Sequence, residues 1–334
     1  MWHLHLNNCI FILMKIPGLL ALMIGALPVV ANPDDRPFPH VEITNGLVTA
    51  TLYLPDPNEG YYRGTRFDWS GVIPVLEYAG HQYHGEWFAT HDPLGHDGIV
   101  GPVEEFEPLG FEQAQAGDQF VKIGVGNLVR PDERAYLFHR RYTLADPGEW
   151  HVETGEQQVS FTHVLKNSDY PYVYSKIVSL PTGEARMVLT HTLKNTGDEV
   201  IETRVYNHNF FVIDNEHTGP GYRVKIPGDT LSPQGAKGLG DVVGLEGNEI
   251  VFLRELQQGE QAYFPDLADG RLVDYALEVQ NTKSGASVKI SGDKPIAKMV
   301  FWSSPTTVCP EPYIDVRVEP GQTFGWTITY EYHH

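Results

Sequence analysis

Cysteine is nearly absent from this chain, which contains only Cys9 and Cys309. Cys9 lies in an apolar N-terminal segment that we expect to be removed, so Cys309 is left alone and no internal disulfide can form. The core must therefore be held together by noncovalent packing. A lone cysteine is most often a small buried apolar residue, and we expect Cys309 to be one.

Positive charge is also scarce. The chain has 24 Lys and Arg against 43 Asp and Glu, which gives a formal net charge of −19. Such a surface repels nucleic acid and anionic lipid, so neither is an expected partner. The sequence also lacks a G-x-S-x-G nucleophile elbow, a phosphate-binding loop and a dinucleotide fingerprint, which disfavours hydrolase and nucleotide chemistry.

Hydrophobic runs of membrane length are missing after the N-terminal segment. Residues 1–31 contain Met14 and a lysine, then the apolar run PGLLALMIGALPVV, and end in the small-residue sequence VVA. This order is typical of a secretory signal peptide, for which Met14 is an alternative start. We therefore expect residues 32–334 to be a periplasmic or secreted protein that has no membrane association once the signal peptide is removed.

Convincing helical periodicity is missing as well, and apolar and polar residues alternate instead in runs rich in Val, Thr, Tyr and Phe. The clearest runs are residues 47–54, 119–128, 157–167, 172–180, 186–195, 200–208, 272–281, 286–292 and 323–332. The Gly- and Pro-rich residues 215–248 are expected to form a long irregular connection. The sequence thus predicts an all-β fold in which residues 32–334 form one large antiparallel β-sandwich with few or no helices.

Two of the predicted strands have an unusual polar face. In residues 200–208, alternation places Tyr206 and His208 on the face opposite the aliphatic side chains. Near the C-terminus it places Glu311 and Tyr313 together, and two prolines fix the backbone on either side of Glu311. Aromatic rings beside charged groups suit the apolar face and the hydroxyls of a sugar. We therefore expect a carbohydrate site, although Glu311 could also be a solvated residue in a turn.

Two longer segments, HTLKNTGDEVIETRVYNHNFF and FWSSPTTVCPEPYIDVRVEPGQTFGWTITYEY, each contain recognisable motifs. The first ends in an Asn-His-aromatic motif, and the second contains a Cys-x-Glu-Pro element, a PGQ turn and a final aromatic strand. Together with RGTRFDWSGVI, they resemble the aldose 1-epimerase (galactose mutarotase-like) families over most of residues 41–332. The resemblance implies a β-supersandwich and an isomerase that opens and recloses a sugar ring without a metal or nucleotide cofactor.

The resemblance also implies which residues act. In those families the histidine of the Asn-His motif is a general acid and the glutamate of the C-terminal block a general base, which correspond to His208 and Glu311. Tyr206 and Asn207 precede the histidine and are expected to contact the substrate.

Other substrate-binding residues are expected outside these motifs. Arg66 of GTRFDWSG is a suitable ligand for a ring hydroxyl or a carboxylate, and Asp266 of YFPDLADG lies roughly where a substrate-binding aspartate falls. The resembled families usually carry a second histidine in a His-Gly pair, which is absent from WFATHDPLGHDGIV. His91 or His96 could replace it, or either could be an ordinary turn residue.

Metal binding is a weaker hypothesis. His208, Asp214 and His217 match no standard zinc spacing, and calcium held by Asp and Asn oxygens in the loop that follows is a somewhat stronger alternative. His191 lies on the apolar side of its strand, so we expect it to be packed rather than to bind a ligand.

Two functions other than an epimerase remain open at this point. A polysaccharide lyase on the same fold would use Arg63, Arg66, Arg140 or Arg141 to neutralise a uronate carboxylate, with a tyrosine or histidine as the base. A non-catalytic glycan-binding module would need only the aromatic and polar face.

Neither the identity of the sugar nor an oligomeric state follows from the sequence.

Overall fold

The computed structural model of the protein describes residues 37–227 and 235–334. The predicted signal peptide, residues 1–31, lies outside the described residues. Residues Pro37–His334 form one compact unit, and its regular structure is almost entirely β-strand. In the described part of the chain the only helical turn is η2, Ile213–Asn215. No helix there is long and apolar enough to cross a membrane.

The strands are, in chain order, β1 His40–Thr44, β2 Val48–Tyr53, β3 Val72–Tyr78, β4 His81–Gln82, β5 Val103–Phe106, β6 Gln119–Lys122, β7 Gly126–Val129, β8 Thr143–Asp146, β9 Glu149–Thr154, β10 Gln158–Leu165, β11 Tyr172–Ser179, β12 Arg186–Asn195, β13 Ile201–His208, β14 Tyr222–Lys225, β15 Val243–Glu246, β16 Glu249–Phe252, β17 Ala262–Phe264, β18 Ala276–Asn281, β19 Ser287–Gly292, β20 Lys298–Ser304, β21 Thr307–Val318 and β22 Thr323–His333.

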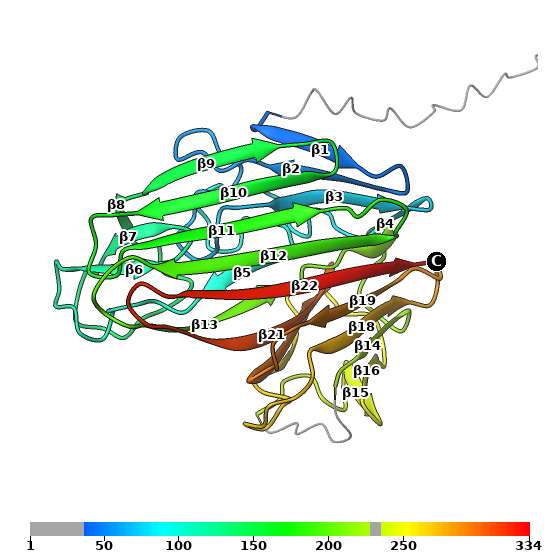
Figure 1. Cartoon of the computed structure of the whole chain (residues 1–334). Coiled ribbons are helices and arrows are strands. Elements are labelled where there is room, and N and C mark those ends of the chain that lie inside the picture. The colour runs from blue at the N-terminus through cyan, green and yellow to red at the C-terminus, as the bar shows by residue number, and fades with distance from the viewer. Residues whose placement is uncertain (1–36, 228–234) are drawn as a thin grey trace, which may run out of the picture. The chain divides into compact units, whose positions relative to one another are not determined.

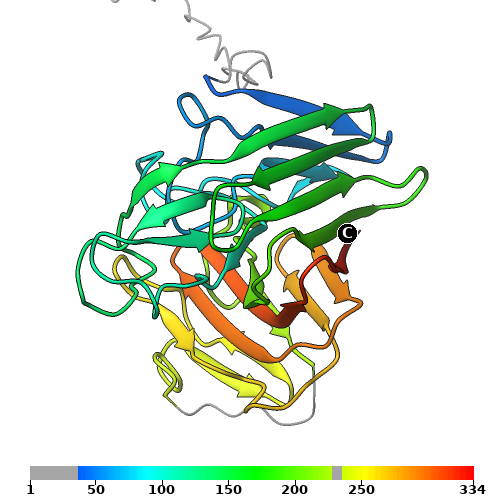
Figure 2. The same ribbon diagram turned by 60° about the vertical axis from the view of Figure 1, so that its left-hand side comes forward.

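These strands form four antiparallel sheets. The largest has the order β15-β16-β14-β18-β19-β22-β12-β11-β10-β9, and a five-stranded sheet has the order β17-β20-β21-β13-β5. Smaller sheets are β1-β2-β3-β4 and β6-β7-β8. The last strand, β22, lies between β19 and β12 and so joins the later strands to the earlier ones (Figure 1). Figure 2 shows the earlier strands, coloured blue and green, on one side and the later strands, coloured yellow to red, on the other.

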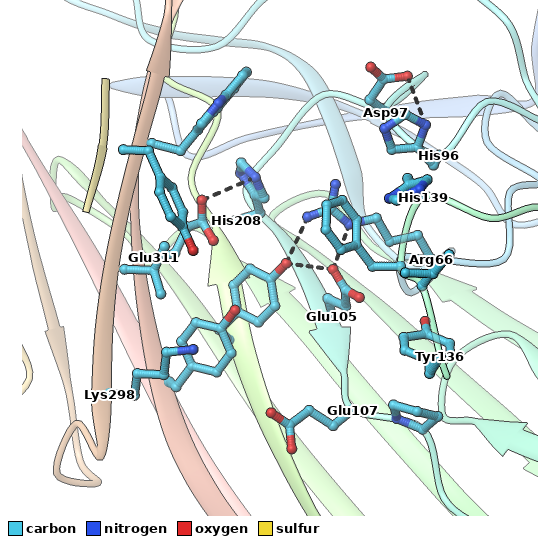
Figure 3. A pocket seen from close by; sticks show the side chains of 18 of the residues that line it. Arg66, His96, Asp97, Glu105, Glu107, Tyr136, His139, His208, Lys298 and Glu311 are labelled. Carbon is cyan, nitrogen blue, oxygen red and sulfur yellow. Dashed lines mark hydrogen bonds and ion pairs between the residues drawn. The ribbon is translucent and has the colours of Figure 1, made fainter. Parts of the chain in front are cut away.

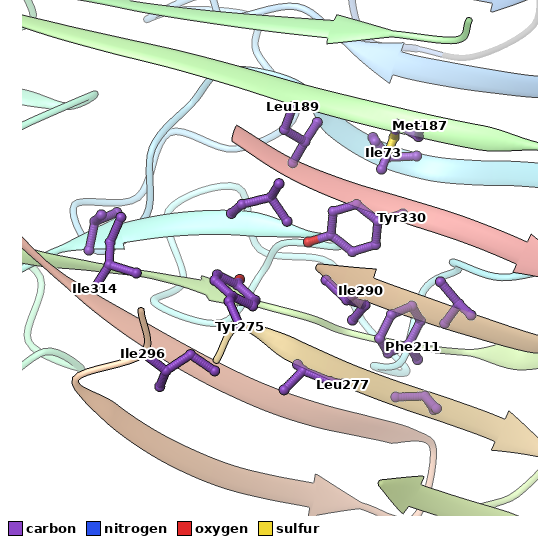
Figure 4. Close-up of a cluster of buried hydrophobic side chains, with 14 of the residues drawn as sticks. Ile73, Met187, Leu189, Phe211, Tyr275, Leu277, Ile290, Ile296, Ile314 and Tyr330 are labelled. Atoms are coloured by element: carbon purple, nitrogen blue, oxygen red, sulfur yellow. The ribbon is translucent and has the colours of Figure 1, made fainter. Parts of the chain in front are cut away.

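The main core is built by alternation along these strands. In β12, Met187, Leu189, His191 and Leu193 are buried, while Val188, Thr190 and Thr192 between them are partly or fully exposed. Tyr330 of β22 and Ile314 of β21 belong to the same buried cluster (Figure 4). Apolar area removed from water contributes roughly 25 cal/mol per Å², so a continuous core between the sheets can stabilise the fold without disulfides. Cys309 is buried, as predicted.

The five-stranded sheet positions the polar residues. Its strands β13 and β21 pair antiparallel, with Tyr206 opposite Tyr313 and Arg204 opposite Asp315. Arg204 and Asp315 are exposed, whereas Tyr206 is buried. A second apolar cluster, which includes Phe67, Phe111 and Phe210, packs beside the end of the sheet that carries Tyr206. The predicted polar face is therefore solvated at one end and enclosed at the other.

The predicted strands differ from the structure at three places. Residues 119–128 form the hairpin β6–β7 rather than one strand, because Gly124 and Gly126 adopt φ angles of +77° and +131° that other residues rarely adopt. Residues 215–248 are not irregular throughout, since they contain β14 and β15, which are too short for their alternation to stand out. Strand β18 occupies only the second half of 272–281. Each remaining predicted run contains one strand.

Candidate active site

A cavity of about 720 Å³ opens over the enclosed end of the five-stranded sheet (Figure 3). Strands β5, β13, β20 and β21 form its floor, and loops from the first half of the chain form its walls. Its lining residues are Arg66, Trp87, His96, Asp97, Glu105, Glu107, Pro108, Phe111, Glu112, Tyr136, Leu137, Phe138, His139, Tyr206, His208, Phe210, Tyr263, Lys298, Val300, Trp302, Glu311 and Tyr313.

His208 and Glu311 meet in this cavity from adjacent strands. His208 Nε2 lies 3.3 Å from Glu311 Oε1, and both side chains are more than nine-tenths buried. The imidazole stacks on Phe210 at 3.9 Å between ring centroids, and the edge of Trp302 lies 5.9 Å away. No described residue donates a hydrogen bond to its Nδ1 or accepts one from it. Ring packing therefore orients the histidine, and its Nε2 faces the carboxyl group.

Burial shifts the pKa of both groups toward their neutral forms. Desolvation raises the pKa of Glu311 to about 8, although the nearby Arg66 opposes the rise. Desolvation and the positive charge of Arg66 both lower the pKa of His208 well below its usual value. Near neutral pH the pair therefore holds one proton.

The raised pKa of Glu311 makes stability depend on pH. Between the ordinary carboxyl pKa of 4.5 and about 8, the folded state binds more protons than the unfolded state, so stability is lost as pH rises through this window. Glu311→Gln removes this penalty. We expect the variant to exceed the wild type by on the order of 2–4 kcal/mol at pH 8, with little difference at pH 5. Denaturant unfolding at both pH values measures this, with the exposed Glu153→Gln as control, and an equal offset at both would contradict it.

A second group of hydrogen-bonded polar side chains lies in the cavity wall next to the His208–Glu311 pair. Arg66 Nε donates to Glu105 Oε2 at 2.6 Å, and Tyr206 Oη donates to the same oxygen at 2.5 Å. Lys122 Nζ lies 3.2 Å from the other oxygen of Glu105. Burial opposes ionisation of Glu105, but Arg66 and Lys122 outweigh it and lower the pKa of that carboxyl. Glu105 is therefore ionised and fixes the orientation of Arg66 beside the catalytic candidates.

Lys298 is the one cation of the cavity, among the described residues, that makes no ion pair. Its Nζ lies 5.0 Å from the centroid of the Tyr313 ring, and Tyr313 stacks on Tyr206 at 4.1 Å. Figure 3 shows Lys298 and Glu311 on one side of the cavity, and Arg66 and His139 on the other. Aromatic floor and charged walls thus surround the space next to the His208–Glu311 pair.

The cavity brings together five of the predicted site residues, namely Arg66, His96, Tyr206, His208 and Glu311. The other three, His91, Asn207 and Asp266, do not line it.

Asn207 faces the opposite side of β13, where its Nδ2 donates to Glu104 Oε1 at 3.0 Å. His91 stacks on Tyr61 at 4.0 Å and is therefore a packing residue. Asp266 caps a turn, because its Oδ1 accepts hydrogen bonds from the backbone amides of Ala268 and Met299.

His191 is packed in the core, as expected, but it is also hydrogen-bonded. It is fully buried, stacks on Trp326 at 4.5 Å, and donates from Nε2 to Glu104 Oε1 at 2.8 Å. Asp214, one of the three residues considered for zinc, pairs with His81 Nδ1 at 2.9 Å. The described residues contain no group of three or more His, Cys, Asp or Glu side chains placed to hold a metal ion.

Several lining residues were not predicted. Glu105 lies in the run VEEF, in which two adjacent carboxylates normally indicate solvent. Trp302 and Lys298 belong to β20, which was not among the predicted strands. Trp87 and Phe138 come from loops. The alternation of β20 beside the Glu311 strand is the signal that could have identified Trp302 and Lys298.

Comparisons with known proteins bear on the fold. The chain matches no family model and no curated protein sequence. Among solved structures, it is similar to a candidate aldose 1-epimerase from Escherichia coli K12, with a TM-score of 0.51 and 12% identity over 88% of this chain and 98% of that one.

Two further structures agree. A galactose mutarotase-like protein from Lactobacillus casei gives a TM-score of 0.52 at 14% identity, over 88% of this chain and all (100%) of that one. A galactose mutarotase related enzyme from Lactobacillus acidophilus gives 0.52 at 12%, over 88% and 97%. At such identities the similarity is evidence of fold, not of activity. The protein therefore has the galactose mutarotase-like β-supersandwich fold.

Proposed function

We propose that this protein is an exported aldose 1-epimerase, in which His208 and Glu311 form the acid–base pair. The observation that carries the proposal is the direct contact of the two side chains, at 3.3 Å, inside a cavity lined by aromatic rings. The names of the proteins that share the fold support the same reaction class. The signal-peptide pattern of residues 1–31 supports a periplasmic or secreted location.

The reaction needs one proton donor and one proton acceptor close to the same carbon atom. The acceptor takes the proton of the C1 hydroxyl as the C1–O5 bond breaks and a carbonyl forms at C1, while the donor protonates O5. Rotation about C1–C2 then presents the other face of the carbonyl, and the ring recloses with the two roles reversed. O1 and O5 are both bonded to C1, so two groups in contact with each other can reach both oxygens.

The protonation of the pair supports this chemistry and refines the roles implied by the resemblance. A pair that holds one proton has a donor and an acceptor in either arrangement, with the proton on Glu311 or on His208. We therefore assign the proton to the pair as a whole, and either member can be the donor of the first step.

This assignment predicts the pH dependence of the reaction. The rate should be highest near neutral pH and fall above about pH 8, where Glu311 loses the shared proton. It should fall again at acidic pH, when His208 gains a second proton. Polarimetry of freshly dissolved α-anomers of glucose and galactose, from pH 5 to pH 9, measures this against the uncatalysed rate. The absence of any acceleration on a panel of aldoses would overturn the proposed function.

A lyase reaction on uronates has less support. Of the arginines that could neutralise a carboxylate, Arg140 makes a bidentate ion pair with Asp132, and Arg63 donates to the carbonyl of Asn58. Arg66 already pairs with Glu105. None of these three is free to meet a uronate without breaking an existing contact, and the fourth, Arg141, does not line the cavity.

A further inference from the structure

The cavity is larger than one pyranose requires. Its volume of about 720 Å³ lies within the range of roughly 300–1,000 Å³ of sites that enclose drug-sized ligands. The His208–Glu311 pair occupies only one side of it (Figure 3). The opposite side, which carries His139 and Tyr136, therefore has room for a second ring.

An exposed aromatic side chain lies on that opposite side. Phe138 lines the cavity with 47% of its surface exposed, and the adjacent Leu137 is 39% exposed. The Arg66 guanidinium covers Phe138 at 4.3 Å from the ring centroid. Since Arg66 is itself held by Glu105, the Phe138 ring is supported from below while much of it stays open to a ligand. An apolar ring fixed in this way is a stacking platform for a sugar.

The charges of the cavity indicate an uncharged ligand. The lining carboxylates outnumber the lysine and arginine side chains, and Arg66 is paired with Glu105. Glu107 and Glu112 are exposed, and no described residue pairs with their carboxylates. Free carboxylates accept hydrogen bonds from hydroxyl groups but repel a uronate.

The position of the catalytic pair sets the direction of the chain. C1 of the reacting ring must lie beside His208 and Glu311, and C4 is at the opposite end of a pyranose. A residue linked to O4 therefore extends away from the pair, across Arg66, toward Phe138. We propose that the protein takes the reducing end of an uncharged 1,4-linked oligosaccharide, with the reacting ring beside Trp302 and the preceding ring on Phe138. This inference rests on the proposed function and specifies its substrate class.

The test compares mutarotation of glucose, maltose, cellobiose and digalacturonate by NMR of the anomeric protons. We expect kcat/KM for maltose or cellobiose to exceed that for glucose by roughly three- to tenfold, the effect of one aromatic contact, and digalacturonate to react more slowly than either. Phe138→Ala should bring the disaccharide-to-glucose ratio close to one, whereas Phe138→Tyr should preserve it. Leu272→Ala, an exposed apolar residue outside the cavity, is the control.

Failure of this inference can be told apart from failure of the proposed function. Equal rates for glucose and both disaccharides in the wild type, or a ratio that Phe138→Ala leaves unchanged, would overturn the second subsite alone. If the wild type turns over no sugar, saturation-transfer NMR of maltose against glucose still tests the subsite. Stronger transfer to maltose that Phe138→Ala removes would support it, and equal transfer would overturn it.

Discussion

Replacing Glu311 with glutamine is expected to lower kcat for mutarotation by roughly 10²- to 10⁴-fold, the usual contribution of one proton-transfer group. Glutamine keeps the size of the side chain and can still hydrogen-bond to His208 Nε2, but it neither gives nor takes a proton. KM should change little, because the ring contacts of Trp302 and Tyr206 remain. The rate of the variant should also lose the decline above about pH 8 that the pKa of Glu311 imposes on the wild type.

The control for this change is Glu202→Gln. Glu202 lies on the same face of β13 as His208 but at the solvated end of the sheet, where it pairs with Arg317, so its replacement should leave kcat unaltered. A Glu311→Gln protein that mutarotates glucose at the wild-type rate would remove Glu311 from the mechanism. Sugar binding without turnover in the wild type, retained in the variant, would instead identify a glycan-binding module.

Much of the fold was predictable because alternation records which face of a strand is buried. The burial of β12 follows a strict period of two, and the same is true of β10 and β11. The hairpin at 119–128 was missed because its turn lies within an apolar run and only Gly124 and Gly126 reveal it. Short strands such as β14 carry too few residues for a period to be recognised.

The site was predictable where side-chain direction was the deciding factor. Parity predicts that Tyr206 and His208 share a face, and both line the cavity. The same parity assigns Asn207 to the opposite face, where its side chain bonds to Glu104. Glu104 and Glu105 illustrate the limit. They are adjacent on β5 and point to opposite sides, one into the core and one into the cavity, and both are buried only because distant strands supply their partners.

Those partners connect the core to the candidate active site. Glu104 accepts hydrogen bonds from His191 of β12 and Asn207 of β13, and its other oxygen contacts Lys176 of β11. Burial opposes its ionisation, but Lys176 and His191 hold the pKa of Glu104 at about 2. Burial and the charge of Glu104 raise the pKa of the neighbouring Asp68 to about 7. Asp68 lies two residues after Arg66, so one buried ionic group supports β5, β13 and the Arg66 loop together.

Replacing Lys176 with methionine is therefore expected to destabilise the protein by about 3–5 kcal/mol, because it leaves the fully buried carboxylate of Glu104 without its main counter-charge. Methionine fills most of the same volume, so the loss reports the charge rather than a cavity. Urea denaturation at pH 7 measures it. Lys194→Met, on the exposed face of β12, should change stability by less than about 0.5 kcal/mol.

A double-mutant cycle separates this electrostatic effect from a packing defect. Glutamine at position 104 can still bind Asn207, so Lys176→Met combined with Glu104→Gln removes both charges and keeps that hydrogen bond. The double variant should lose less stability than the sum of the two single variants, by on the order of 1–3 kcal/mol. Strict additivity would mean that Lys176 and Glu104 act independently. In that case the buried group would not couple the core to the strands that carry Glu105 and His208.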